Sequence, residues 1–240
     1  MADVSAPPSA SSARRWAGRA VFAAILVALF TAYLRLSLTY PENSDEANLL
    51  LMASDIAHGN LLLHGWTVSD VPFITTELPE MAGLVALLGL NLNTAHVAAA
   101  LTYTVVVAVG MLLARGRARG PRAVTRMAVA LAIMLAPQPG VGVFVLVFSV
   151  GHIGTAAPVM LAWLALDRGL ARRNRRWPVP VPVLVPVAAL LAWALMADPL
   201  AGVIAVIPLL LVAAVRLPVL QVPGLRLEKA HNGGVLRSAR

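Results

Sequence analysis

Side chains suited to acid–base chemistry gather in one stretch of the chain. Seven of the eleven Asp and Glu residues lie between positions 39 and 80, where there is no Lys or Arg: Glu42, Asp45, Glu46, Asp55, Asp70, Glu77 and Glu80. A positioned carboxylate can accept a proton or bind a hard cation such as Mg²⁺ or Mn²⁺. The chain has no cysteine, which excludes thiolate nucleophiles, thiolate metal sites and disulfides.

The first of these carboxylates belong to a predicted helix over residues 45–58. Ser44 is suited to the N-cap and Gly59 to the stop that follows the last turn. Asp45 and Asp55 project within an arc of roughly 80°, away from the apolar stripe of the helix. The helix could lie on a membrane surface with its carboxylates turned one way. Alternatively, the acids of the first turn only complement the helix dipole, for about 0.3–1 kcal/mol each.

The composition indicates that these elements belong to a membrane protein. Of the 240 residues, 59% are hydrophobic and 12% are charged, and the mean hydropathy is +0.80. Soluble domains average about 45–50% apolar and about 25% charged residues, so one core cannot hide this apolar excess. We therefore expect an all-α, polytopic bundle of transmembrane helices.

The basic residues predict how the bundle is oriented. Of the 19 Lys and Arg residues, 18 form four clusters, which span residues 14–19, 115–126, 168–176 and 216–240. Short basic loops beside hydrophobic segments stay in the cytoplasm. The clusters therefore predict a plasma-membrane protein with both termini cytoplasmic and an outer loop over residues 39–80. The net charge of +8 is explained by this topology and not by nucleic-acid binding.

Apolar runs between the clusters predict about six spans within residues 14–216. They comprise a first span over 20–34, a second over 95–114, two broken helices within 123–167 and a hairpin within 177–215. The predicted breaks lie at 137–140, at 151–154 and at Asp198-Pro199, near the outer face. Residues 1–13 and 217–240 are expected to be polar cytoplasmic tails.

This topology predicts that several remote ionisable residues share the outer face. Asp45, Glu46, His152 and Asp198 all fall there, and ionisable groups at membrane depth are costly and usually functional. His152 on its own also fits a packed histidine. Arg35, near the outer end of the first span, fits either a side chain that snorkels to the lipid headgroups or a partner for a phosphate.

Three segments in this order resemble part of a known superfamily. They are Ser44-Asp45-Glu46-Ala47, then Ala57-His58-Gly59-Asn60 with Gly65-Trp66, then Thr76-Glu77-Leu78-Pro79 before an expected juxtamembrane helix over 80–90. With a span on either side, they resemble the N-terminal part of GT-C membrane glycosyltransferases, in particular protein O-mannosyltransferases and aminoarabinose transferases. The resemblance covers residues 16–216, whereas members of the superfamily usually carry more spans.

The resemblance implies sugar transfer from a polyprenyl-phosphate donor, with Asp45 as the general base. The side chains it places around the substrate are Glu46, Arg35, Asp55, His152 and Asp198. The leaving phosphate would need a cation or hydrogen-bond donors, for which the outer candidates are Arg35, His58, His64 and His152. Mg²⁺ or Mn²⁺ on Asp45, Asp55 or Asp198 would serve the same purpose, although their spacing is not a metal motif.

A second interpretation requires no catalysis. The same acidic loop fits a multi-pass membrane module that binds a lipid or a partner protein. Transport is a weaker third interpretation, because broken helices also line transporter sites, but the sequence has neither an inverted repeat nor a charged residue at the centre of a span. Convergence of Asp45, Asp198 and residues 151–155 on one cavity would favour the enzyme.

Overall fold

The computed structural model describes residues 10–41, 43–69, 71–136, 152–172 and 181–221, and the regular secondary structure of these residues is helical. The elements are α1 (Ala10–Ser37), α2 (Ser44–Ala57), α3 (Glu77–Leu88), α4 (Leu92–Arg115), α5 (Pro121–Met134), α7 (Ile153–Arg172), α8 (Val181–Ala197), the π-helical turn η1 (Gly202–Val206) and α9 (Ile207–Gln221).

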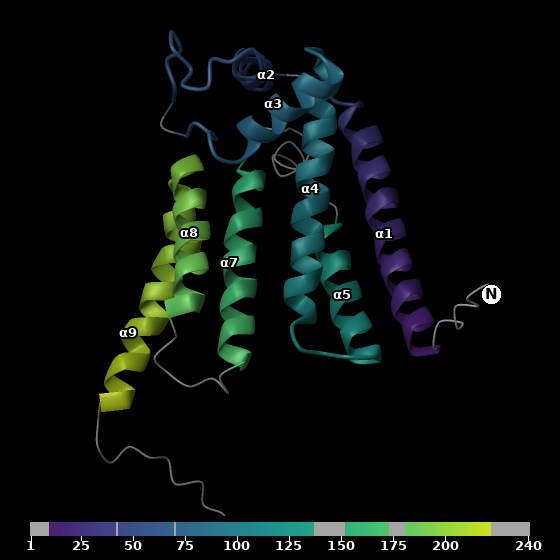
Figure 1. The fold of residues 1–240 in the computed structure, drawn as a ribbon, viewed down its shortest axis with the longest axis vertical. Helices are drawn as coiled ribbons and strands as arrows, with labels where there is room; N and C mark the ends of the chain where they lie inside the picture. The colour runs from purple at the N-terminus through teal and green to yellow at the C-terminus, as the bar shows by residue number, and fades with distance from the viewer. Residues whose placement is uncertain (1–9, 42, 70, 137–151, 173–180, 222–240) are drawn as a thin grey trace, which may run out of the picture.

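The long helices run side by side, and two short helices lie across one end of them (Figure 1). We call the end that carries α2 and α3 the loop end, and the opposite end the basic end. Helix α4 is central, because it packs against α1, α5 and α7, while α8 packs on the far side of α7. Among the described residues, two helices are long and apolar enough to cross a membrane, namely α1 from Trp16 to Ser37 and α4.

Two clusters of buried side chains fix the position of α4. One joins α4 to α1 through Leu29, Tyr103 and Val107, and the rings of Tyr33 and Tyr103 lie 4.1 Å apart between centroids. The other holds the short helices to the loop end and consists of Leu49, Leu50, Met52, Ala53, Leu63, Leu78, Met81, Ala82, Val85, Ala95 and Ala98. Helices α2 and α3 are therefore packed onto the loop end by their own apolar faces.

Several predicted boundaries agree with the structure and others move by a few residues. Helix α7 begins at Ile153, within the segment 151–154 where a break is predicted, but residues 137–151, which include the predicted break at 137–140, lie outside the described residues. Helix α2 occupies Ser44–Ala57, and its cap is Asn43 rather than Ser44, because the Asn43 side chain accepts from the backbone N–H of Glu46. The juxtamembrane helix, expected over 80–90, begins three residues earlier.

The two predicted tails are each shorter than expected. Helix α1 begins at Ala10, inside the segment 1–13, and α9 continues to Gln221, beyond position 216. Ala and Ser prolong α1 at little cost once the helix has formed, whereas the extension of α9 contains Pro218 and helix propensity does not explain it.

Candidate acid–base site at the loop end

Neighbouring acids at the start of α2 have opposite environments. Asp45 is exposed in the first turn, whereas Glu46 is 0% exposed. Successive residues of an α-helix are turned by about 100°, so when the apolar face of α2 packs on α3, only one of the pair can face outward. Asp45 is therefore accessible to a substrate and Glu46 is not.

Asp55 fixes the turn that follows α2. Its Oδ2 accepts hydrogen bonds from Trp66 Nε1 at 2.8 Å and from Asn60 Nδ2 at 3.0 Å. These bonds, first that from Trp66 and then that from Asn60, hold the pKa of Asp55 below its usual value. Gly59 permits the turn because its φ is +104°. The carboxylate that was predicted to share a face with Asp45 is thus engaged by its own loop.

The segment before α3 ties the short helices to α8. Phe73 donates its backbone N–H to the carbonyl of Ala197 at 3.1 Å, and Thr75 Oγ1 donates to the carbonyl of Trp193 at 2.8 Å. Trp193 Nε1 in turn donates to the carbonyl of Thr75. The two bonds between Thr75 and Trp193 join residues 118 positions apart. Together with the Phe73–Ala197 bond they bring Asp198, the residue after Ala197, to the loop end.

His152 and Asp198 form a hydrogen-bonded dyad. His152 Nδ1 lies 2.5 Å from Asp198 Oδ2, and the side chains are 47% and 2% exposed. The other carboxylate oxygen accepts from the backbone N–H of Leu200 at 2.8 Å. An ionised carboxylate only accepts, so we assign the hydrogen to Nδ1, and Nε2 is the ring nitrogen that does not face Asp198. The edge of Phe73 packs against this ring, 5.6 Å away between centroids.

Two acids of α3 lie in the same region, Glu77 buried next to the dyad and Glu80 half-buried. Glu77, 2% exposed, accepts from the backbone N–H of Gly154 at 2.9 Å and from the Thr76 hydroxyl. Glu80 accepts from Thr102 Oγ1 at 2.8 Å through Oε2, and its Oε1 is buried with no hydrogen-bond partner in the described part of the chain. Burial raises the pKa of Glu77, and it raises that of Glu80 to about 7, where the charge of Glu77 adds to the effect.

The structure brings together only some of the side chains that the sequence singled out. His152 and Asp198 meet, while Arg35 is exposed in the last turn of α1. No group of three or more His, Asp or Glu side chains in the described residues could hold a metal ion. Asp45, Asp55 and Asp198 thus do not form a site for Mg²⁺ or Mn²⁺ on their own.

Glu77 and Glu80 were not among the predicted site residues. Their spacing carried a signal, because acids at i and i+3 fall on one face of a helix, and α3 is otherwise almost wholly apolar. A short apolar helix that packs on a bundle must bury such a pair or place it at the rim.

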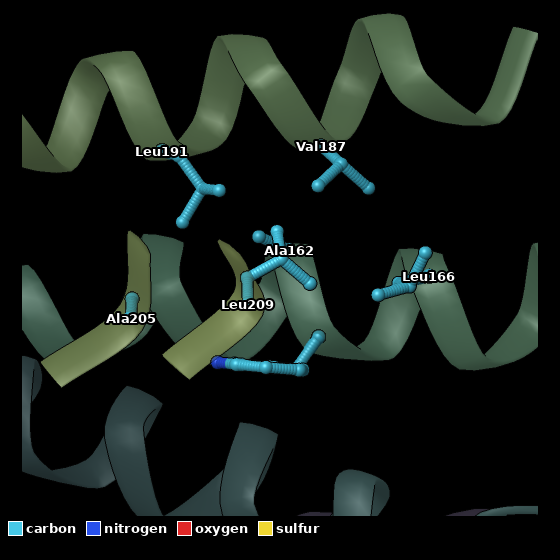
Figure 2. A pocket seen from close by; sticks show the side chains of 7 residues that line it. Ala162, Leu166, Val187, Leu191, Ala205 and Leu209 are labelled. Carbon is cyan, nitrogen blue, oxygen red and sulfur yellow. The ribbon is translucent and has the colours of Figure 1, made fainter. Parts of the chain in front are cut away.

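A shallow apolar pocket lies between α7, α8 and the segment of η1 and α9 (Figure 2). Its lining residues are Ala162, Trp163, Leu166, Val187, Leu191, Ala205 and Leu209. None of them is an acid or a histidine, so this pocket is separate from the acid–base site.

Comparison of the chain with protein-family models, with curated proteins and with solved structures finds no match. Function is therefore inferred from the chain's own residues.

Proposed function

We propose that the chain is a multi-pass plasma-membrane protein of six spans whose loop end faces outward and whose termini are cytoplasmic. The support is the separation of charge along the bundle. The five arginines between Arg115 and Arg126 are exposed where α4 and α5 join, at the basic end (Figure 1), and the acids of α2 and α3 lie at the other end. A reporter fused after Arg173 or Arg240 should be cytoplasmic and one inserted near Asp70 should be outside. An external signal from the Arg173 fusion would contradict this topology.

We further propose that the loop end transfers a sugar from a polyprenyl-phosphate donor to an acceptor hydroxyl. One observation carries this proposal: α2 and α3 lie across the end of the two membrane-length helices and place an exposed carboxylate, Asp45, at the same end as an oriented imidazole. A donor held in the membrane by its lipid would present its phosphate and sugar at that level.

The proposed chemistry assigns Asp45 the role of general base. The acceptor hydroxyl must lose its proton as it attacks the anomeric carbon, and an accessible, positioned carboxylate can take that proton. The first turn of α2 is fixed by the Asn43 cap and by burial of Glu46, which keeps the backbone of Asp45 in place. Glu46 and Asp55 then support the shape of the site.

The experiment is radiolabelled sugar transfer by protein reconstituted in lipid nanodiscs, with polyprenyl-phosphate mannose and polyprenyl-phosphate arabinose as donors. Asp45→Asn keeps the shape and removes the proton acceptor, so transfer should fall by roughly 10²–10⁴-fold with donor binding retained. Asn48→Ala is the matched control, because Asn48 is also exposed on α2 and should leave transfer unchanged.

Two results would count against this function. Transfer that survives Asp45→Asn would refute the proposed base. A wild-type chain that binds donor lipid and transfers neither sugar would favour the non-catalytic alternative, a membrane module that binds a lipid or a partner protein.

A further inference from the structure

Four basic side chains were candidates to assist a leaving phosphate, and the structure distinguishes them. Arg35 and His64 are exposed, and the Nδ1 of His58 lies 2.7 Å from the carbonyl of Ser54 within its own helix. His152 alone among the four is oriented by a buried carboxylate, that of Asp198.

Asp198 is itself rigidly held. It is 2% exposed, and its Oδ1 accepts from the backbone of Leu200 while its Oδ2 faces His152 Nδ1. The carboxylate therefore acts on the ring and not on a ligand. A buried acid in this relation to an imidazole fixes its tautomer and stabilises the ring when it carries a second proton.

We propose that His152, positioned by Asp198, is the catalytic acid that binds and protonates the leaving lipid phosphate through Nε2. This inference rests on the proposed function and deepens it, because it assigns the phosphate side of the site. It also gives the two ends of the reaction separate groups: Asp45 for the acceptor hydroxyl and His152 for the leaving group.

The acceptor oxygen forms a bond to the anomeric carbon and its proton passes to Asp45. The bond from the anomeric carbon to the phosphate oxygen breaks, and the electron pair stays on that oxygen. The Nε2 proton of the imidazolium passes to the phosphate. The products are the glycosylated acceptor, protonated polyprenyl phosphate, neutral His152 and protonated Asp45, and exchange with water restores both side chains.

The surroundings of the ring are compatible with an anion. In the described residues, two acids act on His152: Asp198 directly, and Glu77 through its charge. Glu77 is enclosed and turned to the backbone of Gly154, and Glu80 is turned to Thr102 of α4. The His152 ring is 47% exposed, so it is the part of the cluster that a phosphate can approach.

The test uses His152→Asn, whose amide can still donate to Asp198 but has no counterpart of Nε2. We measure binding of polyprenyl phosphate to nanodisc-embedded protein at pH 6, with the alcohol polyprenol as the ligand that lacks phosphate. The variant should bind polyprenyl phosphate about tenfold more weakly than wild type does and polyprenol equally well, and its sugar transfer should fall roughly 10²-fold. Imidazole added to His152→Ala should restore part of the transfer.

The dependence of transfer on pH separates an acid from a merely structural histidine. A general acid must carry its proton to act, so wild-type transfer should decline as the pH is raised. This decline should be absent in His152→Asn and retained in the matched variant Glu80→Gln. Unchanged phosphate binding and transfer in His152→Asn would overturn the proposal, as would a decline at alkaline pH that is the same in this variant as in wild type. Phosphate binding that depends on His152 in a wild-type chain without transfer would support the phosphate site and refute the transferase.

Discussion

Replacing Glu80 by Gln should make the folded protein less sensitive to alkaline pH. Burial against α4 raises the pKa of Glu80 from 4.5 to about 7, so the folded state favours the protonated carboxyl. The contribution of Glu80 to the unfolding free energy is fully present below pH 4.5 and is lost as the pH rises through 7. A gap of this size between the unfolded and folded pKa corresponds to about 3 kcal/mol of unfolding free energy. Glutamine keeps the shape and cannot ionise.

The assay is an SDS titration of detergent-solubilised protein, followed by circular dichroism at pH 5 and at pH 8. Between these two pH values wild type should lose about 2–3 kcal/mol more unfolding free energy than Glu80→Gln does. Asp45→Asn is the control, because Asp45 is exposed and its substitution should follow wild type. If wild type and Glu80→Gln respond equally to pH, Glu80 is not a buried carboxyl and the reasoning is wrong.

Two further substitutions test the loop end. Gly154→Ala should lower the unfolding free energy by about 1–3 kcal/mol, because a Cβ there would lie 2.5 Å from Glu77 Cδ. In the control Gly83→Ala on α3, the added Cβ meets nothing within 4 Å, so this substitution should be neutral or slightly stabilising. Equal melting temperatures for the two variants would contradict the close approach of Gly154 to Glu77. Asp55→Asn removes the charge that holds Trp66, so thermolysin should cleave the loop after α2 faster at neutral pH. An unchanged cleavage rate would contradict the role of Asp55 in holding this loop.

The sequence predicts the helices best where local signals agree. The apolar run of α4 and the cap, stripe and Gly59 stop of α2 are local signals, and both helices begin and end within a few residues of the predicted positions. Helix α1 contains the predicted span over 20–34 but begins at Ala10. Predicted boundaries move where flanking residues continue a helix, as at Ala10. The count of six spans and the orientation stay predictions, because only α1 and α4 have the length and hydropathy of a span among the described residues.

The site could be predicted only in outline. Topology placed His152 and Asp198 at the same face, but their direct contact depends on the backbone of Phe73 bonding to Ala197, a tertiary pairing with no local signature. The burial of Glu46 instead of its neighbour depends on which face of α2 meets α3. The role of Asp55 depends on a loop returning eleven residues later to Trp66.

The π-helical turn after Asp198 has a consequence for insertions and deletions in this part of the chain. Residues Gly202–Val206 bond with a wider spacing than an α-helix does, so the turn contains one more residue than α-helical geometry needs. Deleting one residue here would let the turn tighten to an α-helix, and the side chains before and after the turn would keep their orientations relative to the bundle. Another residue of the turn would then take the buried position of Ala205. The same deletion farther along α9 would rotate every later side chain by about 100°.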